Sequence, residues 1–399
     1  MAREAERAVL EQAYAEAAGG RPTSVYLRGV SGAGKTALGQ CFLADLAQAG
    51  EAMVLSGRCY EHESVPFKAF DSVLDALSEQ LLAFPSEEIG PLLGAYSAEL
   101  VRVFPVFERI AGVREAAARQ TARQTAREGR MAAEGGEHES RRRAFAALKR
   151  LLYALAVRRP LVLAIDDLHW SDVDSLHLLR ELLAAPEVPP MLVLAAYRSD
   201  WPGSPAALHE LEQIQMRVVP DQSTVRVELG LLAPADARAL ARSLLTAAGL
   251  STGPAAEHWA ATIAAESEGN AFLINAVVRH LSHVPGELAV RLGPGGGLSS
   301  RGAAGSARAL SSLRSLIMAR ITRLEAGERA LLELVAVAGQ PVPADLLGLV
   351  LGRPAGLHGW LGALHKERLI FLGQRGRERS VECSHDRLRE VVVAGLTPE

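Results

Sequence analysis

The sequence predicts an α/β fold, in which a parallel sheet covered by helices is followed by a helical region and a small C-terminal module. Between residues 25 and 229, short apolar runs alternate with stretches that repeat apolar residues at helical spacing. These runs are apolar on both faces, as in strands of a parallel sheet that is buried on both sides. From Pro234 onward the helical pattern dominates.

The first half of the chain supplies the predicted sheet. Residues 2–18 are rich in Ala and Glu and predict a helix that stops at the Gly-Gly-Arg-Pro run of 19–22. Apolar runs predict buried strands at 25–28, 53–56, 161–165, 191–196 and 224–229. Apolar residues at helical spacing predict helices at 37–46, 65–82, 145–157 and 173–184.

The second half is predicted to be helical, apart from a short hairpin near its end. Helical spacing occurs at 236–249, 255–266, 271–282, 310–323 and 327–337. Residues 284–308 contain a Gly-Pro-Gly-Gly-Gly run and then mostly Ser, Gly and Ala, which predicts a linker. The last part is expected to combine helices at 346–351 and 357–365 with strands near 369–372 and 381–384.

Residues 113–143 differ from the rest of the sheet region. Large apolar side chains almost vanish between Val113 and Phe145, and Ala, Arg, Gln, Glu and Gly dominate. Such a segment buries too little surface to offset its ordering entropy, so we expect a mobile insertion or a solvated helix. Contact of its arginines with nucleic acid is less favoured, because no aromatic residues lie between them.

The bulk composition is that of a soluble globular protein long enough for two or three domains. The 399 residues are 49% hydrophobic and 22% charged, with a net charge of −3, so no overall charge favours nucleic acid or anionic membranes. Cys41, Cys59 and Cys383 are far apart and lack metal-ligand spacing. This pattern and the absence of any apolar run of membrane-spanning length predict a reduced, cytoplasmic setting.

The stretch Gly29 to Thr36 fits the phosphate-binding motif G-x-x-x-x-G-K-[ST] at every fixed position, between a predicted strand and a predicted helix. Its glycines allow a tight turn that aims N–H groups at phosphate oxygens, beside the positive end of the helix. Lys35 would reach the outer phosphates, and the Thr36 hydroxyl would bind Mg²⁺. This motif predicts a P-loop NTPase sheet. The residues expected to contact ATP are Gly29, Val30, Ser31, Gly32, Ala33, Gly34, Lys35, Thr36 and Ala37.

Charged side chains follow two of the predicted strands. Asp166 and Asp167 come directly after the run 161–165, as in a Walker B motif. Asp166 is expected to hold Mg²⁺, which prefers few carboxylates and several waters, and Asp167 could orient or deprotonate the attacking water. Arg198 ends the next apolar run, where it could sense the γ-phosphate and stabilise transition-state charge. Lys35, Asp167 and Arg198 are therefore the predicted catalytic residues.

Two aromatic residues directly beyond the acidic pair have two interpretations. His169 could contact water or a neighbouring subunit, whereas packing of His169 and Trp170 is at least as well supported. No His/Cys cluster indicates a structural zinc site, and no nucleophile elbow is present in the sequence.

Together these motifs resemble the STAND class of AAA-related signalling ATPases. The resemblance covers nearly the whole chain except 113–140 and 284–308. The matching stretches are Arg3-Glu4-Ala5-Glu6, Gly29 to Thr36, Leu163 to Trp170, Ala196-Tyr197-Arg198, Glu268-Gly269-Asn270-Ala271-Phe272-Leu273, and Ser384 to Glu390.

The resemblance implies a division of the chain and one further nucleotide contact. It implies a nucleotide-binding domain at 1–230, a helical lid at 231–283, a Gly-rich linker at 284–310 and a winged-helix-like module at 311–399. His385 resembles a histidine that reports the bound diphosphate in relatives. Ala271 stands where the family usually has a proline near the adenine.

Relatives usually join this ATPase to sensor or effector domains, so protein partners or fused domains are expected, as is a nucleotide-dependent oligomer. The chain begins within the first family motif and stops just after the last. This fits either a fragment of a larger regulator or a reduced gene. No membrane partner is expected.

Three functions are compatible with these motifs. The favoured one is a signalling switch, in which ATP closes the lid and the terminal module over the sheet and slow hydrolysis reopens them. A DNA-associated AAA ATPase would use the terminal winged helix, yet residues 357–365 carry almost no positive charge. A metabolic P-loop kinase would have a compact substrate lid rather than a terminal helical module.

Overall fold

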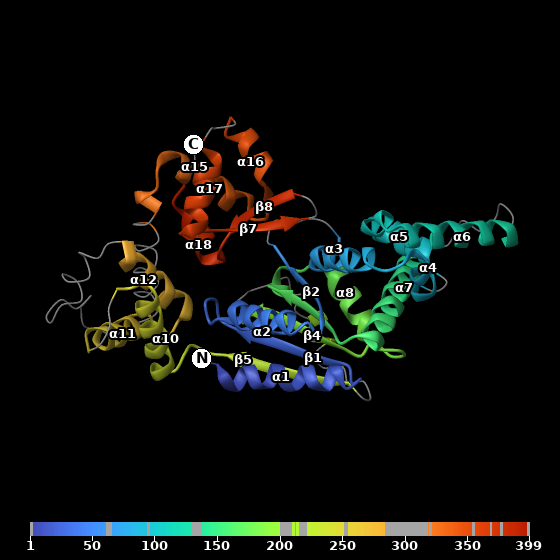
Figure 1. The fold of residues 1–399 in the computed structure, drawn as a ribbon, viewed down its shortest axis with the longest axis horizontal. Helices are drawn as coiled ribbons and strands as arrows, with labels where there is room; N and C mark the ends of the chain where they lie inside the picture. The colour runs from blue at the N-terminus through green and yellow to red at the C-terminus, as the bar shows by residue number, and fades with distance from the viewer. Residues whose placement is uncertain are drawn as a thin grey trace. The chain divides into compact units, whose positions relative to one another are not determined.

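The structure is a computed structural model that forms two compact units (Figure 1). The sheet unit comprises Ala5–Arg28 and Lys35–Glu228, and the C-terminal unit comprises Met1–Glu4, Gly29–Gly34 and Leu229–Glu399. The two units are described separately. The structure describes residues 3–60, 66–93, 96–128, 137–199, 210–211, 213–214, 222–250, 254–283, 318, 321–352, 356–367, 369–375 and 378–396.

The sheet has five strands in the order β2-β3-β4-β1-β5, and every strand predicted between 25 and 229 is present. Strands β2, β3 and β4 pair in parallel, with Leu55 opposite Leu163 and Leu163 opposite Val193. The strands are β1 (Thr23–Gly29), β2 (Met53–Arg58), β3 (Leu161–Asp166), β4 (Met191–Arg198) and β5 (Ser223–Leu229). Parallel strands end at one edge, so this order sets which side chains can meet there.

Both faces of the central strands β3 and β4 are covered, which explains why these two strands are apolar almost throughout. Leu55, Leu163 and Val193 lie on one face and belong to a core cluster that also contains buried residues of the helices α3 (Lys68–Leu82), α7 (Glu137–Arg158) and α8 (Val173–Leu182). On the other face, a Cβ added to Gly39 of α2 (Lys35–Ala49) would lie 3.9 Å from Leu194. The helix α1 (Glu4–Ala18) precedes the first strand. The α/β sheet predicted from the sequence is confirmed.

A group of helices extends the sheet unit beyond β2 (Figure 1). No clear pattern was visible in the sequence of this region, because Pro85, Pro91 and Pro105 interrupt it and Pro91 lies inside a helix. The elements are α4 (Ser86–Leu93), α5 (Ser97–Val103), the 3-10 turn η1 (Pro105–Arg109), α6 (Ala111–Glu128) and the first part of α7.

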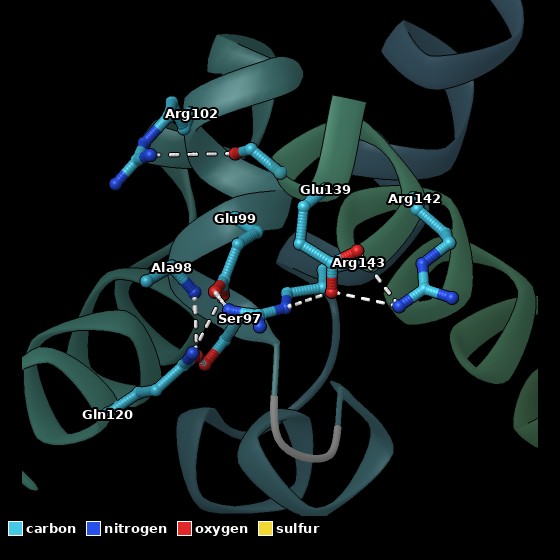
Figure 2. Close-up of polar contacts among 9 residues, drawn as sticks. Ser97, Ala98, Glu99, Arg102, Gln120, Glu139, Arg142 and Arg143 are labelled. Carbon is cyan, nitrogen blue, oxygen red and sulfur yellow. Dashed lines mark hydrogen bonds and ion pairs between the residues drawn. The ribbon is translucent and has the colours of Figure 1, made fainter. Parts of the chain in front are cut away.

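A buried carboxylate connects three of these helices (Figure 2). Glu99 of α5 is 6% exposed, and its Oε2 accepts a hydrogen bond from Gln120 Nε2 of α6 at 2.7 Å. Arg143 Nη1 of α7 lies 3.6 Å from Glu99 Oε1. Gln120 Oε1 in turn accepts from the backbone N–H of Ala98 at 2.9 Å. Because buried polar atoms need partners, these contacts fix α6 and α7 against α5.

The segment 113–143, expected to be a mobile insertion or a solvated helix, contains most of α6 and the start of α7. Val113 is fully buried and Ala116 is 9% exposed, so α6 packs through small residues and through Gln120 rather than through large apolar side chains. Residues 129–136 lie outside the described residues. Mobility of the segment stays a prediction, whereas its helical ends are observed.

The first part of the C-terminal unit is a group of three helices. They are α10 (Pro234–Ala247), α11 (Pro254–Glu266) and α12 (Ala271–His283), at the positions predicted from helical spacing. Ala237, Ala260 and Ile274 are fully buried between them. The adjacent prediction of a linker at 284–308 lies outside the described residues.

The second part of this unit combines helices with a three-stranded antiparallel sheet of order β6-β8-β7. Helix α15 contributes Leu331 and Leu332 to its core, and β8 contributes Val381. The short strand β6 was not predicted. The elements are α15 (Ala326–Ala338), β6 (Val342–Pro343), α16 (Ala344–Val350), α17 (Leu357–Lys366), β7 (Ile370–Arg375), β8 (Glu378–Cys383) and α18 (Asp386–Ala394).

This arrangement is compatible with the winged-helix-like module expected at 311–399, and the four-part division of the chain stays a prediction. Of the helix predicted at 310–323, the structure describes residues 318 and 321–323 only. Among the described residues, none of the helices has the length and apolar character needed to cross a membrane.

Candidate functional site

The predicted metal ligands Thr36 and Asp166 contact each other in the sheet unit. Thr36 lies in the first turn of α2, and Asp166 is the last residue of β3. Thr36 Oγ1 donates a hydrogen bond to Asp166 Oδ2 at 2.8 Å. This bond joins residues that are 130 positions apart in the chain, so the fold places the hydroxyl and the carboxylate of the two motifs side by side.

The charge of Asp166 is disfavoured by its surroundings. Burial raises the pKa of Asp166 to about 6, and the neighbouring carboxylate of Asp167 acts in the same direction. The guanidinium of Arg58 and the hydrogen bond from Thr36 act in the opposite direction, but they do not cancel the shift. A carboxylate in this position would be stabilised by a cation.

Asp167 lies in a strained turn and is paired with an arginine. Its backbone is left-handed, with φ 53°, and its N–H donates to Asp166 Oδ1 at 3.0 Å. Arg58 Nε, at the end of the neighbouring strand β2, donates to Asp167 Oδ2 at 2.8 Å. The side chains of Arg58 and Asp167 are 20% and 9% exposed, so this ion pair is largely shielded from water.

Arg58 was not predicted from the sequence as a site residue. Strand β2 carries no motif, and only the pairing of Arg58 with Asp166 across β2 and β3 brings this arginine to the acidic pair. A useful signal existed: a charged residue at the end of a buried parallel strand lies at the edge where ligands bind.

Asp172 was also missed, and it holds the segment after the acidic pair. Its Oδ1 accepts from the N–H of Ser175, which caps helix α8, and its Oδ2 accepts from the N–H of Lys68 at 3.1 Å, at the start of helix α3. Ser175 Oγ accepts from the N–H of Ala69. One side chain thus connects the starts of two helices that flank the turn following Asp167.

His169 and Trp170 form part of that turn. Their ring centroids lie 5.1 Å apart, and the His169 side chain is 1% exposed, with Nδ1 3.9 Å from Asp167 Oδ1. This burial supports the packing interpretation of the pair. Arg198 is the last residue of β4, which lies between β3 and β1 in the sheet.

The phosphate loop Gly29–Gly34 connects β1 to α2 and adopts a conformation that needs glycine at two positions. Gly32 and Gly34 have φ of 80° and 98°, values that side chains rarely adopt. The N–H of Ala33 donates to the carbonyl of Val30 at 3.3 Å, which closes the turn. Lys35 follows as the first residue of α2 and is 6% exposed, whereas Ala37 is exposed.

In the C-terminal unit, the loop contacts the start of helix α12. Asn270 Nδ2 donates to the carbonyl of Ser31 at 3.2 Å, and the N–H of Phe272 donates to the carbonyl of Gly32 at 3.3 Å. The ring of Phe272 stacks on His385, with centroids 3.8 Å apart. The Glu-Gly-Asn-Ala-Phe-Leu stretch and His385 are therefore neighbours within this unit.

The residues fit a magnesium site with few protein ligands. Within the described part of the chain, no group of three or more His, Cys, Asp or Glu side chains could hold a metal ion. Mg²⁺ binds instead through one or two protein oxygens, water and phosphate. Thr36 and Asp166 offer two adjacent oxygens, and the charge of the Asp166 carboxylate is only partly compensated by its neighbours.

Comparison with known proteins agrees with this geometry. Residues 1–194 match the AAA ATPase domain family, whose members bind nucleotide and usually Mg²⁺. No curated protein matches the sequence.

Several solved structures are similar to this chain. A STAND protein with a tetratricopeptide repeat sensor from Pyrococcus horikoshii is 14% identical, with a TM-score of 0.53 over 100% of this chain and 43% of that chain. The chain thus spans less than half the length of that protein. A Walker-type ATPase of Pyrococcus abyssi is 13% identical, with a TM-score of 0.42 over 98% of this chain and 95% of that chain. Cdc6p from Pyrobaculum aerophilum is 12% identical, with a TM-score of 0.41 over 98% of this chain and 93% of that chain.

The family match covers the strands β1 to β3 and the first half of β4, with the phosphate loop and the acidic pair. At 14% identity, the structural likeness to the STAND protein shows a shared fold along the whole chain. Residues 1–194 thus match the AAA ATPase domain family, and the whole chain shares its fold with a STAND protein.

Proposed function

We propose that this protein binds ATP, hydrolyses it slowly and acts as a nucleotide-dependent conformational switch in signal transduction. The observation that carries the proposal is the hydrogen bond from Thr36 Oγ1 to Asp166 Oδ2 at 2.8 Å. It joins the last residue of the phosphate-binding motif to the first residue of the acidic pair. A glycine-rich turn that matched the motif by chance would have no reason to meet a carboxylate at a strand end.

The phosphate loop supplies the binding energy in this proposal. The backbone N–H groups of Gly32 and Gly34 and those at the amino end of α2 would donate hydrogen bonds to phosphate oxygens, since helix N-termini and successive N–H groups attract anions. The amino group of Lys35 would neutralise charge on the outer phosphates. The proposed contacts also include His385, on the resemblance to the family alone.

Thr36 and Asp166 are the proposed ligands of Mg²⁺. Bound Mg²⁺ would neutralise charge that develops on the phosphate oxygens. Thr36 and Asp166 would orient this ion through one oxygen each, with phosphate oxygens and water in its remaining positions. In the bound state the carboxylate of Asp166 is ionised, because its pKa falls when a cation lies beside it.

Asp167 is the proposed base that orients or deprotonates the attacking water. Its Oδ2 accepts from Arg58 in this structure, so this oxygen is already occupied and less available to an attacking water. This pairing supports slow hydrolysis. Arg198 at the end of β4 is the proposed side chain that stabilises charge on the γ-phosphate.

The switch requires a contact that only one nucleotide makes. The γ-phosphate would provide it through Lys35 and Arg198, so that ATP and ADP favour different arrangements of the chain. Sensor or effector domains and nucleotide-dependent oligomers are the proposed partners. DNA remains the less favoured partner, because helix α17 contains one lysine and no arginine.

The test is nucleotide binding and turnover, measured by fluorescent-nucleotide titration and phosphate release. Lys35→Ala should abolish binding, because the outer phosphates lose their cation, whereas Asp167→Asn should retain binding and lose turnover. Lys366→Ala replaces an exposed lysine of α17 and should change neither property. If Lys35→Ala binds ATP as the wild type does, or Asp167→Asn turns it over at the wild-type rate, the assigned roles are wrong.

A further inference from the structure

Three successive carbonyl groups of the phosphate loop each accept a hydrogen bond from a distant part of the C-terminal unit. Ser31 O accepts from Asn270 Nδ2 at 3.2 Å, and Gly32 O accepts from the N–H of Phe272 at 3.3 Å. Ala33 O accepts from Arg3 Nη2 at 3.3 Å. Donors that come from 30 to 240 positions away in the chain therefore hold this side of the loop.

The orientation of these carbonyls determines where the loop amides point. In a planar trans peptide, the C=O of one residue and the N–H of the next point in opposite directions. When the carbonyls of Ser31 and Ala33 face Asn270 and Arg3, the N–H groups of Gly32 and Gly34 face away from them. Successive N–H groups turned to one side form the concavity that binds phosphate.

Asn270 is placed to set this orientation, since both the oxygen and the nitrogen of its side-chain amide form hydrogen bonds. Its Oδ1 accepts from the N–H groups of Phe272 and Leu273, at 3.1 and 3.2 Å, and so caps the first turn of α12. With the oxygen used for the cap, the amide nitrogen is directed to Ser31 O. The cap thus determines which end of the amide faces the loop.

Gly32 allows the loop and Asn270 to approach this closely. A Cβ added to Gly32 would lie 2.4 Å from Asn270 Oδ1, which no real side chain tolerates. The glycine therefore serves two purposes: it adopts the positive φ of the turn and it leaves space for the amide.

We propose that Asn270 is a positioning residue for the phosphate loop, one that couples the order of the loop to the first turn of helix α12. The proposal rests on the proposed function in one respect, namely that the loop binds a nucleotide. A ligand that fixes the loop then also stabilises the start of α12, and loss of the Asn270 contact weakens nucleotide binding from a distance.

The test uses Asn270→Ser, because serine keeps a neutral cap for α12 but is too short to reach Ser31. Asn275→Ser is the matched control: the same substitution in the same helix, where Asn275 Oδ1 accepts from Arg279 and not from the loop. Asn270→Asp is the second variant, since it retains the cap oxygens and removes the donor.

The first measurement is amide hydrogen exchange of the full chain without nucleotide. Losing one hydrogen bond should loosen the loop and speed exchange of the Ala33 amide, which donates to the carbonyl of Val30, about fivefold in both Asn270 variants. In both Asn270 variants, the amides of α12 beyond its first turn should exchange as in the wild type. In the control Asn275→Ser, the loop amides should also exchange as in the wild type. Unchanged loop exchange in Asn270→Ser would overturn the proposal, as would equally faster exchange along the whole of α12.

The second measurement is the dissociation constant of fluorescent ADP. We expect it to rise about fivefold in Asn270→Ser and to stay within about twofold of the wild type in Asn275→Ser. Faster loop exchange with unchanged ADP affinity would refute a positioning role. If the wild type itself binds neither ADP nor ATP, the proposed function fails, while the exchange experiment still decides whether Asn270 orders the loop.

Discussion

The ion pair between Arg58 and Asp167 makes a quantitative prediction for the variant Arg58→Gln. Removing one partner of a fully buried pair costs about 3–5 kcal/mol, and breaking an exposed pair costs about 0–1 kcal/mol. With side chains 20% and 9% exposed, this pair lies between the two limits. We expect Arg58→Gln to lower the free energy of unfolding by about 1–3 kcal/mol near neutral pH.

This loss should depend on pH because Asp166 lies next to the pair. A carboxyl whose pKa is raised in the folded state binds its proton more tightly there than in the unfolded state. Ionised Asp166 therefore costs stability above about pH 6, and this cost disappears as the pH falls from 6 toward 3.8. Once Asp166 is neutral, it no longer repels the carboxylate of Asp167, so the ion pair with Arg58 contributes less to the stability of the folded state. The destabilisation by Arg58→Gln should shrink below pH 6.

The assay is urea unfolding of the nucleotide-free protein at about pH 7.5 and about pH 5, with Arg28→Gln as the control. Arg28 pairs with Glu228 on the same sheet at 2.9 Å, but their side chains are 47% and 61% exposed. That variant should lose less than about 1 kcal/mol at both pH values. The reasoning is refuted if Arg58→Gln is no more destabilising than Arg28→Gln, or if its effect is equal at both pH values.

Two further predictions concern packing. Gln120→Ala leaves the buried carboxylate of Glu99 without the amide that donates to it at 2.7 Å, so it should lower the free energy of unfolding by about 1–3 kcal/mol. The control Arg119→Ala, at an exposed position of the same helix, should change the free energy of unfolding by less than about 0.5 kcal/mol. Gly327→Ala would place a Cβ 2.0 Å from the Trp360 ring and should cost about 1–3 kcal/mol, although Gly359→Ala, which has open space, should be neutral or stabilising. Urea unfolding measures all four variants, and a Gly327→Ala protein as stable as Gly359→Ala would contradict the packing.

The sheet was predictable because its strands are apolar on both faces. The runs that contain Leu55, Leu163 and Val193 read as buried strands, and the structure places these residues on one face in register. The polar helices next to the sheet were less predictable. Helix α6 packs with Val113, alanines and the amide of Gln120, and none of these residues produces the apolar periodicity that identifies a buried helix.

The candidate site was predictable only where a motif carried it. Gly29 to Thr36 and the acidic pair were found because their spacing is tied to a known chemistry, and the contact of Thr36 with Asp166 agrees with the expected roles. Arg58, Asp172 and the loop contact of Asn270 depend on strand pairing and on helix caps between distant segments. No local pattern encodes such contacts.

These distant contacts explain how a phosphate loop could report on its ligand. Its N–H groups are the ones that a phosphate would occupy, and its carbonyls are already bonded to Asn270, Phe272 and Arg3. A ligand that orders one side of a peptide plane necessarily orders the other side, because the two groups belong to one rigid unit. At a free nucleotide concentration 100 times its dissociation constant, binding adds about 2.7 kcal/mol of stability. On the proposal that Asn270 positions the loop, part of that energy is shared with the first turn of α12.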